Sequence, residues 1–162
     1  MPEIVQAARG DARAVAECVR AAYAHYVARI GREPAPMTAD YEALIGAGEV
    51  WVARAGERVA GVLVLRPRPP ALLLENVAVA PDRQGEGLGR ALVAFAEDRA
   101  RAQGLAEVVL YTNERMTENL RFYPALGAGI AGKGKRISAL TTPAYATSIT
   151  QLPSPRILSE LL

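Results

Sequence analysis

The residues best suited to chemistry form a glycine-rich turn, Gln84-Gly85-Glu86-Gly87-Leu88-Gly89. The turn follows an apolar strand and precedes a segment with apolar residues at helical spacing. A helix that begins at such a turn presents free backbone N–H groups and the positive end of its dipole, which together bind phosphate. Glycines also let the backbone turn tightly and approach a ligand. The turn therefore predicts a site for a phosphorylated ligand.

The spacing of the glycines excludes two common phosphate motifs. A dinucleotide fingerprint needs G-x-G-x-x-G after the first strand of a βαβ unit, with an acidic residue about 20 positions later. A P-loop needs a Gly-Lys-Ser or Gly-Lys-Thr ending. This chain has G-x-G-x-G and no such ending. An ordinary strand-to-helix turn without a ligand stays open as an alternative.

Composition limits the class of protein. The chain has 162 residues, 51% of them hydrophobic and 22% charged, which fits one soluble globular domain. A net charge of +2 without a basic run argues against nucleic acid, and no segment is apolar and long enough for a membrane or signal peptide. One Cys and one His exclude an internal disulfide and a His/Cys zinc site, so we expect no metal and a cytoplasmic location.

The order of predicted elements indicates a mixed α/β fold in which a hairpin feeds a central strand. Strands are expected at residues 4–8, 50–54, 58–65, 72–79 and 107–111. Helices are expected at residues 12–30, 38–45, 88–103 and 117–123, with Asp11 and Thr38 as N-caps of the first two. The strand at 72–79 has apolar residues at both odd and even positions, so both of its faces should be buried in the middle of the sheet.

The flanks of the turn give it a specific resemblance. Residues 74–81, the turn itself and residues 90–93 resemble motif A of the GNAT superfamily of N-acetyltransferases. Residues 110–113 look like the fifth strand of that family. Asn119, Tyr123 and the Leu126-Gly127 pair look like the segment that follows it. Order and spacing agree over residues 4–127.

The resemblance implies the acyl-CoA N-acyltransferase fold, a mixed, mostly antiparallel, splayed central sheet flanked by helices. It implies acetyl-CoA as co-substrate and direct acetyl transfer to a primary amine of a small molecule or peptide. The pantetheine arm would pair with the fourth strand, and the pyrophosphate would lie on the turn, with Arg83 and Arg90 near the phosphates. The implied donor-binding residues are Val77, Ala78, Val79, Gln84, Gly85, Glu86, Gly87, Leu88, Gly89, Arg90, Asn119 and Tyr123.

Two residues are candidates for catalysis. Tyr123 matches the general acid of the family, and a phenol with a pKa near about 10 stays protonated at neutral pH. Glu75 is the candidate base, because it interrupts an apolar strand and carboxylates are rarely buried without a partner or a role. The alternatives are a packed tyrosine, an ion pair of Glu75 with an arginine, and for Asn119 a surface position. His25 is a weaker candidate on the acceptor side.

The amino-acid composition of the chain changes at about residue 128. All serines and both lysines lie after Gly127, and Ala128 stands where the family usually has an aromatic residue. We expect one domain over residues 1–152 and an extension over 153–162. Our hypothesis is that the tail arose by a reading-frame shift, which translation of the other frames past codon 127 tests.

Rival functions remain at this point. A non-catalytic acyl-CoA-binding module or sensor of the same fold would keep the glycine turn and lack turnover. A purely structural or dimerisation role is disfavoured by the intact turn and Tyr123. A homodimer is compatible with either function, and the acceptor cannot be read from the sequence, because acceptor contacts are made by side chains on loops.

Overall fold

The computed structural model describes residues 2–111, 128–130 and 136–140 of the 162-residue chain. The predicted helix at 117–123, with Asn119 and Tyr123, lies outside the described residues. None of the described helices is long and apolar enough to cross a bilayer.

A single sheet of seven strands organises the described residues, in the order β1-β2-β3-β4-β5-β7-β6. The strands are β1 (Glu3–Gln6), β2 (Val50–Ala55), β3 (Arg58–Arg68), β4 (Ala71–Val79), β5 (Glu107–Tyr111), β6 (Ala128–Ile130) and β7 (Arg136–Leu140). β4 and β5 pair in parallel, and every other pair of neighbours is antiparallel. This is the mixed, mostly antiparallel sheet that the sequence predicts.

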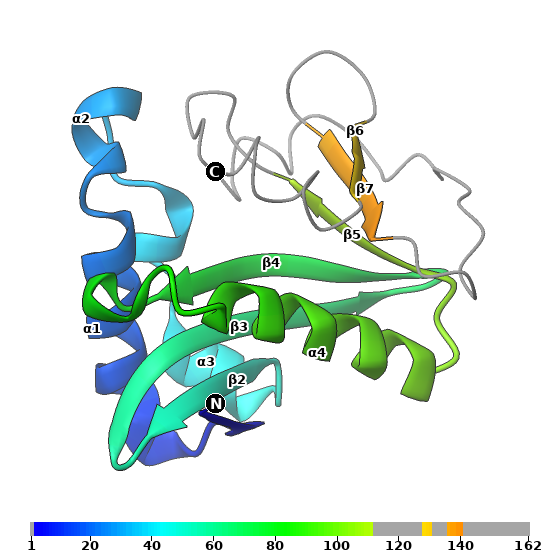
Figure 1. Ribbon diagram of the computed structural model, residues 1–162, viewed down its shortest axis with the longest axis horizontal. Coiled ribbons are helices and arrows are strands. Elements are labelled where there is room, and N and C mark those ends of the chain that lie inside the picture. The colour runs from blue at the N-terminus through cyan, green and yellow to red at the C-terminus, as the bar shows by residue number, and fades with distance from the viewer. Residues whose placement is uncertain (1, 112–127, 131–135, 141–162) are drawn as a thin grey trace.

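Helices cover both faces of the sheet (Figure 1). One layer holds α1 (Ala12–Tyr23), α2 (Tyr26–Ile30) and α3 (Tyr41–Gly46), and the other holds α4 (Leu88–Ala102). Three short 3₁₀ turns, η1 (Arg9–Asp11), η2 (Ala35–Met37) and η3 (Pro81–Arg83), join these elements. Each face has its own core: Val15, Val19, Val52 and Val62 pack on the α1 side, and Leu63, Leu72, Leu88 and Leu92 pack on the α4 side.

Two predicted helix boundaries are wrong. The helix expected over residues 12–30 is interrupted after Tyr23, where the Val27 N–H bonds to Ala24 O in a loose i,i+3 contact of 3.3 Å. Thr38 does not cap α3, since its hydroxyl bonds to Ala35 O. Asp40 is the N-cap instead, and its carboxylate accepts from the Ala43 N–H at 3.0 Å.

A β-bulge at Glu75 interrupts the pairing of β3 with β4. Val64 lies opposite Asn76 and Leu65 lies opposite Leu74, so Glu75 has no partner on β3. The extra residue reverses which face of the sheet the following side chains occupy. Leu74 belongs to the α4 core, whereas Ala78, also at an even position, belongs to the α1 core.

Gly61 lets α4 lie close to β3. A Cβ at this position would stand 3.0 Å from Leu92 Cδ1, 3.3 Å from Leu88 Cδ2 and 3.3 Å from Ala78 O. Those contacts are tighter than ordinary van der Waals packing, so a side chain here would push on the first turns of α4. The position of the glycine turn that precedes α4 thus depends on the absence of a side chain on β3.

The sheet is splayed between β4 and β5. Their parallel pairing runs from Ala71 opposite Glu107 to Leu74 opposite Leu110 and stops there, although β4 continues to Val79. In Figure 1 the two strands diverge beyond this point. The last residues of β4 therefore have β3 on one side and, within the described part of the chain, no paired strand on the other.

Candidate functional site

The site begins at the unpaired side of β4, which we call the open edge and which consists of the backbone of Val77 and Val79. Backbone N–H and C=O groups of an antiparallel strand point alternately to its two sides. The Ala80 N–H bonds to Ala60 O on β3, so the groups of Ala80 and Ala78 point toward β3. Those of Val77 and Val79 point the other way, where a ligand could add to the sheet as an extra strand.

The glycine turn lies next to the open edge and leads into α4. Gly85 and Gly87 have φ angles of 81° and 84°, a backbone conformation that side chains disfavour. A Cβ on either residue would meet nothing within 4 Å, so the glycines serve the backbone conformation and leave the space above it empty. Gly87 is the N-cap of α4 and has no capping side chain.

The N-terminus of α4 is suited to an anion. The first intrahelical bond described here runs from the Ala91 N–H to Gly87 O, so the N–H groups of the three preceding residues have no acceptor within the helix. The helix dipole adds partial positive charge at the same place. A phosphate bound there would be held by backbone donors, with an exposed arginine, Arg90, beside it.

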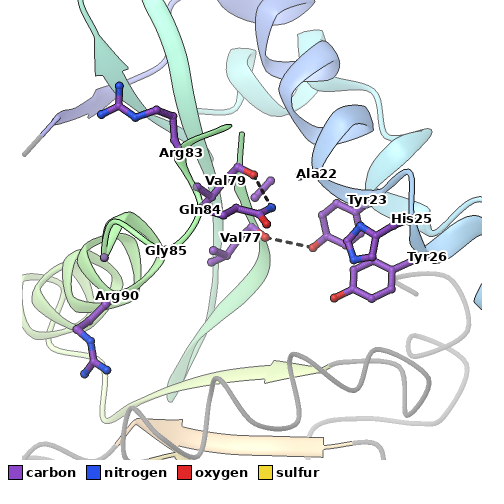
Figure 2. A pocket seen from close by; sticks show the side chains of 13 residues that line it. Ala22, Tyr23, His25, Tyr26, Val77, Val79, Arg83, Gln84, Gly85 and Arg90 are labelled. Carbon is purple, nitrogen blue, oxygen red and sulfur yellow. Dashed lines mark hydrogen bonds between the residues drawn. The ribbon is translucent and has the colours of Figure 1, made fainter. Parts of the chain in front are cut away.

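The open edge and the glycine turn form one cavity of about 420 Å³, which we call the donor cavity (Figure 2). Its lining comes from β4, from the turn and from the end of α1 with the start of α2: Ala22, Tyr23, His25, Tyr26, Val77, Ala78, Val79, Arg83, Gln84, Gly85, Gly87, Gly89 and Arg90. The ring of His25 lies 3.9 Å from that of Tyr26, and the Arg29 guanidinium lies 5.3 Å from the Tyr26 centroid. This side of the cavity is aromatic and basic.

Two side chains bond to the carbonyls of the open edge. The Tyr23 hydroxyl lies 3.3 Å from Val77 O, and Gln84 Nε2 donates to Val79 O at 3.2 Å. Figure 2 draws both bonds, with Tyr23 reaching β4 from the α1 side and Gln84 reaching it from the turn. Val79 O thus accepts from the protein itself, whereas Val77 O has only the longer of two contacts that share the one Tyr23 proton, the shorter being to Asn76 Oδ1 at 2.7 Å.

A second cavity, of about 230 Å³, lies between η2, α3 and the middle of the sheet, and we call it the Glu75 cavity. Its wall combines apolar groups with a few polar ones: Ala35, Pro36, Thr38, Ala39, Tyr41, Leu44, Val64, Glu75 and Asn76. The bulge puts Glu75 and Asn76 side by side on this wall. Arrangements of this kind can bind a small polar group in an otherwise apolar setting.

A buried hydrogen-bond chain connects the two cavities. The Tyr23 hydroxyl donates to Asn76 Oδ1 at 2.7 Å, and Asn76 Nδ2 donates to the Tyr41 hydroxyl at 3.3 Å, which in turn donates to Pro36 O. Asn76 is 4% exposed, so its amide depends on these two tyrosines for its partners. Burial raises the pKa of Tyr41, which keeps its hydroxyl protonated as a donor.

Glu75 stands in a group of three charges. Arg66 lies between two carboxylates, with Nη1 3.4 Å from Glu75 Oε2 and Nε 3.0 Å from Glu49 Oε2. The ion pair that the sequence left open for Glu75 is therefore present. Desolvation by burial nevertheless raises the pKa of Glu75, while the positive charge of Arg66 opposes that shift and Glu49 adds to it.

The structure brings most of the predicted donor-binding residues together. Val77, Ala78, Val79, Gln84, Gly85, Gly87, Gly89 and Arg90 all line the donor cavity. Leu88 is 2% exposed and packs into the α4 core, so only its backbone faces the turn. The exposed Glu86 pairs with Arg83 at 2.8 Å. Glu75 lies in the other cavity, and His25 lies on the donor side.

Sequence reasoning missed Tyr23, Tyr26 and Asn76. Tyr23 and Tyr26 are three residues apart in the predicted helix at 12–30, and this spacing was the available signal for an aromatic wall. Asn76 carried the same signal as Glu75, a polar residue within an apolar strand. No group of three or more His, Cys, Asp or Glu residues gathers in the described part of the chain.

Known proteins resemble this chain in sequence and in fold. A family model described as "Acetyltransferase (GNAT) family" matches residues 15–128. The rat protein "N-acetyltransferase family 8 member 2" is 29% identical over 145 residues, which cover 82% of this chain and 63% of that protein. The chain thus spans under two thirds of that relative's length.

Solved structures share the fold at low identity. The PaiA N-acetyltransferase of Thermoplasma acidophilum, solved with coenzyme A, superposes with a TM-score of 0.75 at 18% identity over 85% of this chain and 97% of that one. A GNAT family acetyltransferase of Brucella melitensis, solved with acetyl-CoA, has a TM-score of 0.63 at 20% identity over 88% of this chain and 90% of that one. The acyl-CoA N-acyltransferase fold expected from the sequence is confirmed.

Proposed function

The chain belongs to the GNAT acetyltransferase family, and on that premise we propose that it transfers the acetyl group of acetyl-CoA directly to a primary amine. One observation carries the proposal: the open edge of β4 and the amides of the glycine turn lie in a single cavity of about 420 Å³. A ligand that joins a phosphate group to an extended amide-bearing arm would use both at once.

Acetyl-CoA is such a ligand. Its pantetheine arm can add to Val77 and Val79 as an extra strand, because both residues turn their N–H and C=O groups to the unpaired side. Its pyrophosphate can accept from the N–H groups of the turn, with Arg83 and Arg90 adding positive charge at the rim. The Thermoplasma and Brucella proteins were solved with coenzyme A and acetyl-CoA, which supports this assignment.

The reaction forms a C–N bond between the amine and the acetyl carbon and breaks the thioester C–S bond. We propose that Glu75 accepts the proton that the amine loses, directly or through a water molecule. Its raised pKa, caused by desolvation, makes its carboxylate a stronger base than that of an ordinary glutamate. Tyr123 is proposed to protonate the departing thiolate of CoA, and Asn119 to bind the cofactor or the Tyr123 segment.

We propose that the amine approaches from the Glu75 cavity. The carboxylate of Glu75 is 16% exposed and lies on the wall of that cavity, on the same strand as the open edge. A neutral amine needs a nearby proton acceptor, and a mostly buried carboxylate with a raised pKa is a stronger one than an exposed carboxylate.

The decisive experiment measures acetyl-CoA consumption over a panel of small amines, aminoglycosides and peptide N-termini, with the wild type and Tyr123→Phe. Turnover on one acceptor class that falls by about 100-fold in Tyr123→Phe supports the enzyme, because loss of a general acid has effects of this size. Tight CoA binding without turnover on any amine supports the rival function, an acyl-CoA-binding module. Failure to bind CoA contradicts both.

A further inference from the structure

Side chains of the protein already contact the two outward carbonyl oxygen atoms of the open edge. Val77 O has the Tyr23 hydroxyl at 3.3 Å, and Val79 O accepts from Gln84 Nε2 at 3.2 Å. The two donors come from different elements, Tyr23 from the last residue of α1 and Gln84 from the turn before α4. Figure 2 shows both side chains reaching the same edge of the strand.

These contacts occupy the positions that an added strand would need. An extra strand donates its N–H groups to the outward carbonyls of its neighbour, here Val77 O and Val79 O. The side chains of Tyr23 and Gln84 stand on that edge and line the same cavity. A pantetheine arm that pairs with β4 therefore has to displace them from these two oxygen atoms.

We propose that Gln84, and to a smaller extent Tyr23, are stand-in donors: Gln84 donates to Val79 O, and Tyr23 shares with Val77 O the proton that it donates mainly to Asn76 Oδ1, until the amide N–H groups of pantetheine replace both contacts. The inference rests on the proposed use of acetyl-CoA. The stand-in donors lower the affinity for the pantetheine arm and leave the affinity for the nucleotide part unchanged.

Both side chains have another hydrogen-bond partner once a ligand displaces them from the carbonyls. The Tyr23 hydroxyl already has Asn76 Oδ1 at 2.7 Å, a shorter contact than that to Val77 O, so it stays hydrogen-bonded after displacement. Gln84 is exposed, and its amide can turn to water. Gln84 donates to Val79 O without sharing the proton with another acceptor, so its removal should have the larger effect.

The test compares two ligands, one with the pantetheine arm and one without. CoA has the arm, whereas 3′-phosphoadenosine 5′-diphosphate has the same nucleotide and pyrophosphate but no pantetheine. Isothermal titration gives both dissociation constants for the wild type, Gln84→Met and Tyr23→Phe. Any effect of Gln84 on the pyrophosphate is common to both ligands, so the ratio of the two constants isolates the arm.

We expect Gln84→Met to tighten CoA about threefold relative to the truncated ligand, because one modest hydrogen bond of the free protein no longer competes. Tyr23→Phe should change the ratio in the same direction by less. The matched control is Gln103→Met, which replaces an exposed glutamine at the end of α4. It should leave the ratio unchanged.

The outcomes separate the two proposals. If both ligands bind and Gln84→Met leaves the ratio unchanged, the stand-in role is wrong and the proposed function stands. If Gln84→Met weakens CoA alone, Gln84 is a ligand of the arm and the stand-in role is again wrong. If neither ligand binds the wild type, the proposed function fails and the inference with it. Because Gln84 lies on the surface, its variant tests the idea even if Tyr23→Phe unfolds.

Discussion

The donor cavity and the Glu75 cavity both adjoin β4, but they differ in whether backbone groups or side chains are available to bind a ligand. In the donor cavity, the groups suited to bind a ligand are backbone groups: the outward groups of Val77 and Val79 and the amides after Gly85 and Gly87. In the Glu75 cavity they are side chains, those of Glu75 and its neighbour Asn76 among apolar residues. Backbone recognition needs only a conformation, whereas side-chain recognition needs particular residues. The comparison explains why a particular ligand can be proposed for the donor cavity, whereas for the Glu75 cavity only the reacting group, a primary amine, can be proposed.

The difference also assigns different sensitivities to the two cavities. In the donor cavity, substitutions should matter where they change the course of the backbone. In the Glu75 cavity, they should matter where they change a charge or a hydrogen-bonding group. The following predictions test that division, beginning with the largest expected effect.

The sharpest test of the Glu75 cavity is Glu75→Gln, which keeps the shape and removes the base. We expect kcat to fall by about 100-fold, the usual size of a lost general base, with little change in the dissociation constant of CoA. Steady-state kinetics and titration calorimetry measure the two quantities. Glu42→Gln, at an exposed position of α3, is the control. If CoA affinity in Glu75→Gln fell by as much as kcat, the two cavities would not act separately and the proposed division would be wrong.

The next test concerns the packing that holds the glycine turn. Gly61→Val should lower the free energy of unfolding by about 1–3 kcal/mol, because its methyl groups would overpack Leu88 and Leu92 of α4. Urea unfolding measures the change. Gly46→Val is the control, since a Cβ there meets nothing within 4 Å. A stable Gly61→Val variant with unchanged CoA affinity would show that α4 can shift without harm to the donor cavity.

A smaller effect is expected inside the turn. Gly87→Ala places a side chain at a φ angle of 84°, which costs roughly 1–2 kcal/mol, so the turn relaxes and CoA binding weakens by about fivefold. The matched control is Gly104→Ala, which has a similar strain at φ 66° beyond the C-terminal end of α4, the end opposite to the glycine turn. Titration calorimetry should show weaker CoA binding in the first variant alone. Equal affinities in both would argue against backbone recognition.

The mildest test uses pH. With Glu75 as base, kcat/KM falls as pH drops through the pKa of Glu75, which desolvation raises above its ordinary value of 4.5 and Arg66 opposes. Arg66→Met removes the opposing charge, so the acidic limb should move to higher pH. The pH dependence of kcat/KM measures the shift, and a limb that moves downward contradicts the assignment.

The same raised pKa has a consequence for stability. The folded protein binds the Glu75 proton more tightly than the unfolded chain does, so this group contributes less to the free energy of unfolding as pH rises from 4.5 through the folded pKa. Replacement by glutamine should therefore flatten that part of the stability profile.

The donor cavity could be predicted from the sequence because its signals are local. Glycines at 85 and 87 mark positive φ angles, and an apolar strand before them marks a buried element that delivers the turn. The Glu75 cavity could not be predicted to the same extent. Tyr41 and Asn76 are 35 residues apart, and their contact depends on how α3 packs on the sheet.

Local rules also failed where two capping residues competed. Thr38 and Asp40 are both good N-caps, and the helix begins after the second because its carboxylate reaches the Ala43 N–H. The bulge escaped notice for a related reason. The run Leu72-Leu73-Leu74 is apolar at every position, so it carries no alternation from which a change of phase could be read.

The change of style at residue 128 stays a prediction. The family model ends its match at that residue, where serines and lysines begin to replace the arginine-rich composition. Asn119 and Tyr123 lie outside the described residues, so their roles rest on the family pattern alone. Translation of the alternative reading frames remains the direct test of the tail.

The bulge at Glu75 has a consequence for how this strand can evolve. Loss of that single residue would remove the carboxylate and the bulge together. Val64 already lies opposite Asn76 and Leu65 opposite Leu74, so the shortened strand would pair with β3 without interruption, and the residues after it would keep their faces. The bulge therefore holds an extra polar residue in β4 without disturbing the open edge that follows it. Among relatives, absence of this one residue should be commoner than insertions or deletions between Asn76 and the glycine turn, which would turn the outward carbonyls toward β3.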